Sequence, residues 1–154
     1  MRRMGRAIPD AHLAPDGREN EQHVTVKYGL SDNEPPARLI AAVANFGPVK
    51  VKFGKTSIFK NDDAHVVKID IQSPDLHRLN KLIGRIVETP GNTHPTYIPH
   101  ATIAYVKKEH SKKYDGDGTL SGQEASVAHV IFSGKDGRHH IVPLVEKKSE
   151  YRAS

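Results

Sequence analysis

Two histidine-centred segments of this chain are near copies of each other. The first is His23-Val24-Thr25-Val26-Lys27-Tyr28 and the second is His100-Ala101-Thr102-Ile103-Ala104-Tyr105. Both read His-x-Thr, then a β-branched residue, one variable position and Tyr. Because residues i and i+2 of a strand point to the same face, each copy predicts an imidazole beside a hydroxyl. A fold that brings the copies together would place two histidines and two threonines around one space.

Two imidazoles and two hydroxyls are a set of groups that can break a phosphodiester without a metal. A neutral imidazole removes a proton from the nucleophile, and an imidazolium protonates the leaving oxygen. The ring nitrogens would then lie roughly 5–8 Å apart. The threonine hydroxyls can donate to the non-bridging oxygens, where negative charge grows in the transition state. The predicted catalytic residues are therefore His23, Thr25, His100 and Thr102.

The pairing of two copies is what makes the pattern informative. A third His-x-Thr, His94-Pro95-Thr96, has proline in the middle and lies between turn residues, and we interpret it as a chance match. A single copy would most simply be an ordinary core strand whose histidine happens to fit. That structural interpretation stays open as an alternative for the pair.

The residues around the two copies suggest further roles. Lys27 shares the face of His23 at i+4, where the second copy has Ala104. A lysine there disfavours charge on His23, so we expect His23 to be the base and His100 the acid, with Lys27 binding substrate. The alternative is that Lys27 is a plain surface cation. Tyr97 precedes the second copy and is expected to stack on a nucleobase, or else to pin its loop.

The two tyrosines that end the copies have a different expectation. Tyr28 and Tyr105 stand at i+5 from the histidines, so on a regular strand they point away from the histidine face. We therefore predict that they are core residues rather than catalysts.

The composition limits the class of protein. The chain has 154 residues, no cysteine and a formal net charge of +5, with a sequence pI near 9.4. We expect one domain, residues 1–154, with a core at about residues 6–145 and flexible ends. The charge favours an anionic partner. Without cysteine or a His-Glu-x-x-His motif, we expect no metal and no cofactor. No apolar run is long enough for a membrane span and no secretory signal is visible, so a cytoplasmic location is expected.

The hydrophobic patterns predict a mixed α/β arrangement of short elements. We expect at most a short strand at residues 6–8, followed by a loop, and an exposed basic loop at residues 108–122. The lysines of the basic loop either bind phosphates or are simply solvated. A turn is expected at residues 29–34. One helix is expected at residues 35–46, stopped by Gly47, and another from Pro74 to Pro90-Gly91, capped by Ser73. Strands are expected at residues 22–28, 50–59, 64–71, 100–106, 126–133 and 139–145, and the third has Val67, Ile69 and Ile71 on one face.

The order of these elements suggests an internal repeat. Strand, helix, strand, strand is followed by helix, strand, strand, strand, with one His-x-Thr copy in each half. We therefore expect an α+β fold of two pseudo-symmetric lobes, each with a helix and a small antiparallel sheet, around a central cleft.

The segments HVTVKYG and PHATIAY resemble the motifs of the 2H phosphoesterase superfamily, which includes 2′-5′ RNA ligase-like proteins and cyclic phosphodiesterases. The resemblance spans about residues 6–145. It implies a bilobed fold and metal-independent attack on RNA-type phosphodiesters, with His23, Thr25, His100 and Thr102 at the matching positions. Substrates implied are 2′,3′-cyclic ends, 2′-5′ linkages or cyclic oligonucleotides.

Several alternatives stay open beside that interpretation. The same site permits the reverse reaction, joining RNA ends, and it also suits a non-catalytic nucleotide- or RNA-binding module or a virion-associated part. The residues that flank the motifs are similar to those in short proteins of tailed phages. This resemblance suggests a role in counter-defence against a host's cyclic-nucleotide signal. We expect no membrane partner and no obligatory protein partner.

Overall fold

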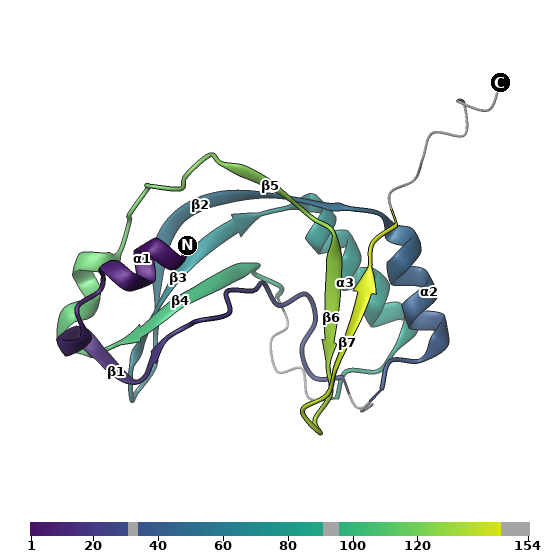
Figure 1. The fold of residues 1–154 in the computed structure, drawn as a ribbon, viewed down its shortest axis with the longest axis horizontal. Coiled ribbons are helices and arrows are strands. Elements are labelled where there is room, and N and C mark those ends of the chain that lie inside the picture. The colour runs from purple at the N-terminus through teal and green to yellow at the C-terminus, as the bar shows by residue number, and fades with distance from the viewer. Residues whose placement is uncertain (31–33, 91–95, 146–154) are drawn as a thin grey trace. The chain divides into compact units, whose positions relative to one another are not determined.

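The computed structural model describes residues 1–30, 34–90 and 96–145, and the chain divides into two compact units (Figure 1). The first unit holds all four predicted catalytic residues, whereas Lys27 and Tyr97 belong to the second. The first consists of Met1–Thr25, Lys52–Gln72 and Ile98–Glu124, and the second of Val26–Val51, Ser73–Tyr97 and Ala125–Ser154.

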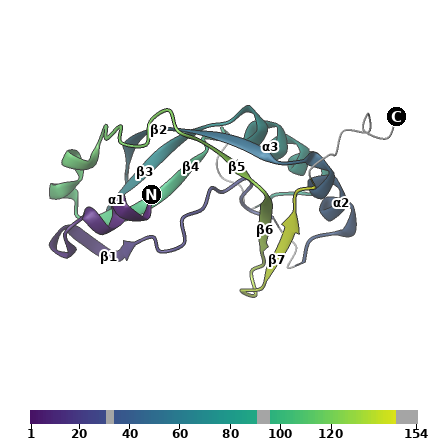
Figure 2. The same ribbon diagram turned by 45° about the horizontal axis from the view of Figure 1, so that its top comes forward.

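A five-stranded sheet organises the first unit (Figures 1 and 2). β4 pairs antiparallel with β1 on one side and with β3 on the other, and β3 pairs antiparallel with β2. The strand order is β1 (Leu13–Arg18), β4 (His100–Val106), β3 (His65–Gln72), β2 (Val49–Lys60) and β5 (Glu124–Val127). β2 and β5 each include residues that are assigned to the second unit.

The sheet of the first unit has one apolar and one polar face. Along β3, Val67, Ile69 and Ile71 are 2%, 0% and 5% exposed, as their alternation predicted. Ala101 and Ile103 of β4 are buried as well, and α1 (Arg2–Ala7) packs on β4. The residues between them along β3 and β4 are polar and half-buried, so the polar face is the one available for chemistry.

The N-terminal expectation was wrong in two places. Residues 6–8 are not a strand, because α1 continues to Ala7 and the short helix η1 (Asp10–His12) follows. The residues after η1, expected to be a loop, form β1. Pro15 and Gly17 are tolerated there because β1 is an edge strand that pairs only with β4.

The expected strand at residues 22–28 is also absent as such. Its one ladder contact is an isolated antiparallel bridge between Val24 and Ala101. The Val26 carbonyl accepts a hydrogen bond from the Asn80 side-chain amide, 2.6 Å long, instead of one from a neighbouring strand. The prediction that Tyr28 is a core residue was wrong, since it is 62% exposed, while Tyr105 is half-buried.

The second unit contains two helices and a hairpin. α2 (Ala37–Phe46) ends where Gly47 adopts a φ of 89°, as the sequence predicted. α3 (Pro74–Ile86) begins with the predicted cap, because the Ser73 hydroxyl accepts a 3.1 Å hydrogen bond from Leu76 N. α3 ends at Ile86, four residues before Pro90. The expected strand at 126–133 is split between β5 and β6 (His129–Ser133), and β6 pairs with β7 (His139–Pro143).

The basic segment after β4 is more structured than expected. Its first part forms the short helix η2 (Lys108–Tyr114). The buried Thr56 of β2 then holds the chain that follows: its hydroxyl donates to the Tyr114 carbonyl (2.6 Å) and accepts from Asp117 N (2.7 Å). The segment is therefore attached to the sheet rather than a free loop.

Some expectations lie outside the described residues. These are the middle of the turn at residues 29–34, Gly91 and most of the third His-x-Thr, and the chain end after residue 145. The arrangement of one lobe per motif copy is not confirmed, because the His-x-Thr residues of both copies fall within the first unit. In the part of the chain that is described, no helix has the length and apolar character to span a membrane.

Candidate active site

The two His-x-Thr copies meet at the bridge between Val24 and Ala101. In an antiparallel pair, the positions that flank a bridge on one chain lie across from those that flank it on the other. His23 therefore lies across from Thr102, and Thr25 lies across from His100. The four side chains share the face opposite to that of the buried Ala101, so each histidine has the threonine of the other copy as its cross-strand neighbour.

Both imidazoles are held in the same way by the backbone. Nδ1 of His23 lies 2.8 Å from the Glu21 carbonyl oxygen, and Nδ1 of His100 lies 2.9 Å from the Ile98 carbonyl oxygen. In each copy the acceptor is the residue two positions before the histidine. Because a carbonyl oxygen only accepts, each Nδ1 carries a proton and donates it. The neutral form of each ring therefore has its lone pair on Nε2, which is the atom left for chemistry.

The local backbone presents these groups to solvent without exposing the core. His23 and Thr25 are exposed, while His100 and Thr102 are half-buried in β4. The ladder between β3 and β4 shifts register next to Thr102, where Ile103 is an extra residue. Such bulges increase the local twist of a strand and re-aim side chains, and they occur often beside functional sites.

The neighbouring strand adds charged residues that sequence reasoning missed. In the register of β3 and β4, Lys68 is the partner of Thr102 and Asp70 is the partner of His100. Lys68 donates to Asp70 Oδ1 (2.7 Å) and to Ser57 Oγ (2.6 Å). The available signal was the alternation in β3, where two charged residues stand between buried Val67, Ile69 and Ile71 and so share the polar face.

The two predicted substrate-binding residues lie in the second unit. The ammonium of Lys27 approaches α3, so that a Cβ placed on Gly84 would lie 3.3 Å from Lys27 Nζ. Tyr97 packs edge-to-face against His77 of α3, with 5.3 Å between ring centroids. Burial raises the pKa of the Tyr97 hydroxyl. Within their own unit, both side chains therefore have contacts with α3.

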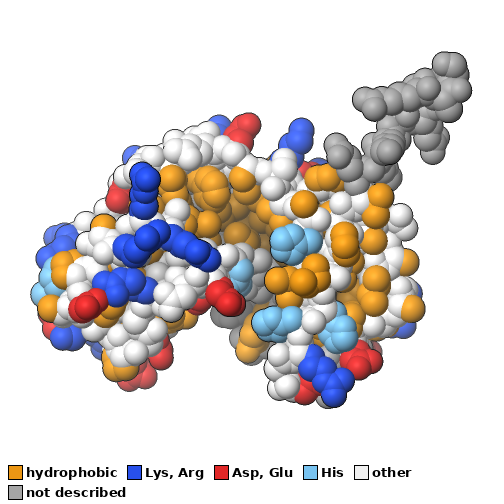
Figure 3. Space-filling model, in the orientation of Figure 1, with side chains coloured by type: hydrophobic (Ala, Val, Ile, Leu, Met, Phe, Trp, Pro, Cys, Tyr) orange, Lys and Arg blue, Asp and Glu red, His pale blue; other side chains and the backbone are white. Residues whose placement is uncertain are grey.

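A second group of histidines in the first unit is organised around η2. His12 and His110 stack with 3.9 Å between ring centroids, and His12 Nδ1 lies 2.6 Å from the Tyr114 hydroxyl. His65 Nδ1 lies 2.7 Å from Ser111 Oγ. Desolvation, together with the positive charges of His110 and two nearby lysines, lowers the pKa of His12. This group attaches η2 to η1 and β3. Figure 3 shows Lys and Arg side chains on this face of the first unit.

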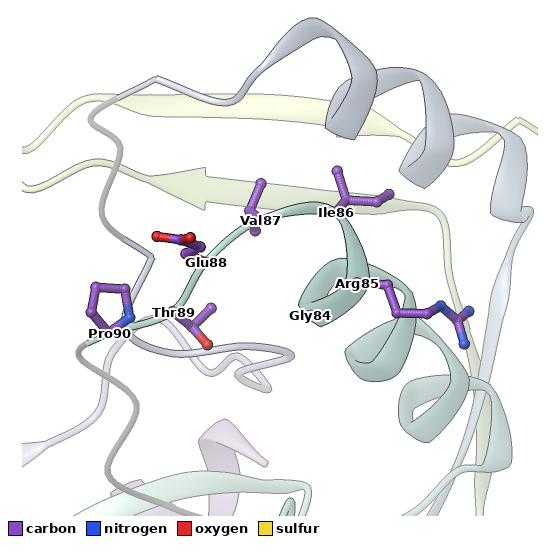
Figure 4. Close-up of a pocket in the computed structure, with 7 residues that line it drawn as sticks. All are labelled: Gly84, Arg85, Ile86, Val87, Glu88, Thr89 and Pro90. Carbon is purple, nitrogen blue, oxygen red and sulfur yellow. The ribbon is translucent and has the colours of Figure 1, made fainter.

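A pocket in the second unit does not contain the paired motifs. It has a volume of about 480 Å³ and is formed by the last turn of α3 and the residues after it (Figure 4). Its two charged side chains, Arg85 and Glu88, point away from each other, so they do not converge on one bound group. In the described ranges, no three His, Asp or Glu side chains gather as a metal-binding group.

A family model described as the 2′-5′ RNA ligase superfamily matches residues 3–114, well over half of the chain. The chain belongs to this superfamily. The match includes both His-x-Thr copies and the strand that carries Lys68 and Asp70, and it ends with η2. No curated protein and no solved structure matches this chain.

Proposed function

We propose that this superfamily member is a metal-independent phosphodiesterase whose catalytic residues are His23, Thr25, His100 and Thr102. The observation that carries the proposal is the matched pair of hydrogen bonds from Nδ1 of each histidine to the carbonyl two residues before it. These bonds leave the Nε2 atom of each ring available for proton transfer. A pair of that kind suits proton transfer at the two ends of one displacement.

The reaction divides between the two rings. With a 2′,3′-cyclic phosphate, one neutral imidazole takes a proton from water as the water oxygen bonds to phosphorus. The other ring, as imidazolium, gives its proton to the ribose oxygen as the bond between that oxygen and phosphorus breaks. The products are a phosphomonoester and a free hydroxyl, and solvent exchange restores the two protonation states. His23 as base and His100 as acid stay a prediction.

The threonines act on the phosphate rather than on the proton transfers. Charge on the non-bridging oxygens increases as the nucleophile bonds to phosphorus. Hydroxyls of Thr25 and Thr102, fixed in position by the backbone, donate to those oxygens. Because the bridge at Val24 sets each hydroxyl across from the histidine of the other copy, one phosphate can contact both pairs.

The proposed substrates carry a phosphodiester at a ribose 2′ or 3′ oxygen. The superfamily description, which refers to 2′-5′ RNA, and the net charge of +5 support this class. Within it, 2′,3′-cyclic ends, 2′-5′ linkages and cyclic oligonucleotides are the candidates. A phage counter-defence role is a further prediction, which requires turnover of a cyclic oligonucleotide.

A panel of substrates in EDTA tests the proposed function. It contains 2′,3′-cyclic mononucleotides, 2′-5′ and 3′-5′ dinucleotides, and cyclic di- and trinucleotides. Hydrolysis of at least one member by the purified protein supports the proposal, and the product linkage identifies the bond that breaks. Absence of turnover across the panel by folded protein would contradict it and favour the nucleotide-binding alternative.

A second assay tests whether the protein hydrolyses the cyclic phosphate or joins two RNA ends. The protein is incubated with two RNA fragments, one ending in a 2′,3′-cyclic phosphate and the other in a 5′-hydroxyl. A phosphodiesterase leaves an uncyclised phosphomonoester on the first fragment. Appearance of a joined product with a 2′-5′ linkage would instead establish the ligase activity.

A further inference from the structure

The polar face of the first unit contains a charged group beside the paired motifs. Lys68 of β3 is the register partner of Thr102, and on its other side it is the partner of Ser57 in β2. Directly paired residues of neighbouring strands have Cβ atoms about 4.5–5.5 Å apart and point to the same face. Ser57, Lys68 and Thr102 thus form one row across the sheet, and the bridge at Val24 continues that row to His23.

The ammonium of Lys68 is fixed rather than free to move. Its side chain is only 14% exposed, and Nζ donates to Asp70 Oδ1 at 2.7 Å and to Ser57 Oγ at 2.6 Å. Ser57 in turn donates to the same carboxylate oxygen at 2.8 Å. An ammonium has three donors, so these two acceptors leave one N–H for another group.

The ladders on both sides of the Lys68–Asp70 pair are irregular. Opposite Asp70, β2 has two residues, Gly54 and Lys55, where a regular ladder would have one. A Cβ on Gly54 would lie 3.3 Å from the Asp70 carbonyl oxygen, so the absence of a side chain permits the close approach. With the bulge beside Thr102, register shifts flank the Lys68–Asp70 pair on both neighbouring strands.

We propose that Lys68 is a further catalytic residue, whose ammonium contacts a non-bridging oxygen of the substrate phosphodiester beside Thr102. This inference rests on the proposed function. The threonines and the backbone offer only neutral donors, whereas the phosphodiester is an anion that gains negative charge in the transition state. A fixed positive charge, largely shielded from water, stabilises that state more than a mobile surface lysine does.

Asp70 and Ser57 are positioning residues in this arrangement. They hold Lys68 Nζ on the polar face beside the threonine and prevent it from extending into solvent. The competing interpretation is that Lys68 and Asp70 form a structural ion pair with no contact to substrate. The two interpretations differ in what happens when both charges are removed together.

The test compares K68M, D70N and the double variant K68M/D70N with wild type, using the substrate identified in the panel. Lys60→Met, an exposed lysine at the end of β2, is the matched control. We expect K68M to lower kcat/KM by about 10²–10³-fold, chiefly through kcat, while Lys60→Met retains the wild-type value. Lys68→Arg should recover part of the activity because it restores a cationic donor.

The double variant decides between the two interpretations. It leaves no unpaired charge, so it should unfold close to the wild-type temperature even where a single variant is unstable. We expect its kcat/KM to be as low as that of K68M. Recovery of wild-type kcat/KM in K68M/D70N, or full activity in folded K68M, would overturn the role of Lys68 and leave the proposed function intact.

Failure of the proposed function would be seen separately. If wild type hydrolyses no panel member, inorganic phosphate is titrated into ¹⁵N-labelled protein. Shifts of the Thr102 and His100 amide resonances in wild type that are lost in K68M would support Lys68 as an anion-binding group. Absence of these shifts in wild type would overturn it.

Discussion

At the scale of single residues, the matched surroundings of His23 and His100 are more informative than their identity. Each ring donates from Nδ1 to the carbonyl two residues earlier, and each lies across the bridge from a threonine. The hydrogen bond selects the tautomer, and the register brings a hydroxyl beside each ring. Proton transfer and charge stabilisation are therefore assigned to different side chains.

The hydroxyl of Thr102 can be tested without changing the shape of the strand. Thr102→Val replaces the hydroxyl with a methyl group and keeps the β-branched side chain that suits β4. We expect kcat/KM to fall by about 10²-fold, as for loss of one donor to a developing negative charge. Thr102→Ser should keep most of the activity. Equal rates for Thr102→Val and wild type would contradict a role in catalysis.

His12 predicts a pH dependence of stability that is separate from activity. Its pKa in the folded protein is below the ordinary value of 6.5, through desolvation first and then through His110, Lys113 and Lys107. As the pH falls through about 6.5, the unfolded chain therefore binds a proton before the folded chain does, and the free energy of unfolding falls until the pH is below the lowered pKa of His12.

Thermal unfolding of His12→Asn checks this prediction. Between about pH 7.5 and about pH 5.5, wild type should lose more of its Tm than the variant does. The variant also lacks the contact with the Tyr114 hydroxyl, so its Tm at the higher pH should be lower. An identical pH dependence in the two proteins would contradict the prediction.

At the scale of elements, side chains attach the irregular segments to the sheet. Thr56 is 3% exposed, and its hydroxyl satisfies both the Tyr114 carbonyl and the Asp117 N–H. Its backbone also bonds to Asp117 and Gly116. Thr56 therefore holds the chain directly after η2 against β2.

Thr56→Val should destabilise the protein because it removes the hydroxyl that pairs with two partly buried backbone groups, the Tyr114 carbonyl and the Asp117 N–H. We expect a loss of about 1–3 kcal/mol in the free energy of unfolding. Urea unfolding followed by circular dichroism measures it. The exposed Thr96→Val is the control and should remain within about 0.5 kcal/mol of wild type. A change in Thr56→Val as small as in the control would argue against this attachment.

Sequence patterns predicted the elements that carry their own local signals. α3 has a serine cap, a proline at its first position and an apolar stripe, and β3 alternates between apolar and charged residues from Val67 to Ile71. Both elements form nearly where expected. The patterns failed where pairing with a distant segment determines the secondary structure. β1 depends on β4. The segment around Val24 retains one bridge, and the Val26 carbonyl accepts from the Asn80 side chain instead of from a strand.

At the scale of the whole molecule, the sequence predicted the four proposed catalytic residues but not their surroundings. Repetition alone indicated His23, Thr25, His100 and Thr102. The register of β3 against β4, which no spacing rule supplies, added Lys68 and Asp70. The carbonyl acceptors of the two histidines are likewise a property of the folded backbone. Membership of the 2′-5′ RNA ligase superfamily agrees with the chemistry read from the motifs.

The most direct test of the two-histidine mechanism compares wild type with His23→Ala and His100→Ala in EDTA. The exposed His129→Ala of β6 is the control, and thermal unfolding verifies that each variant is folded. We predict that wild type and His129→Ala turn over the panel substrate, and that each motif variant loses about 10²–10⁴-fold in kcat/KM. Wild-type turnover by either folded motif variant, or loss of wild-type activity in EDTA, would contradict the mechanism.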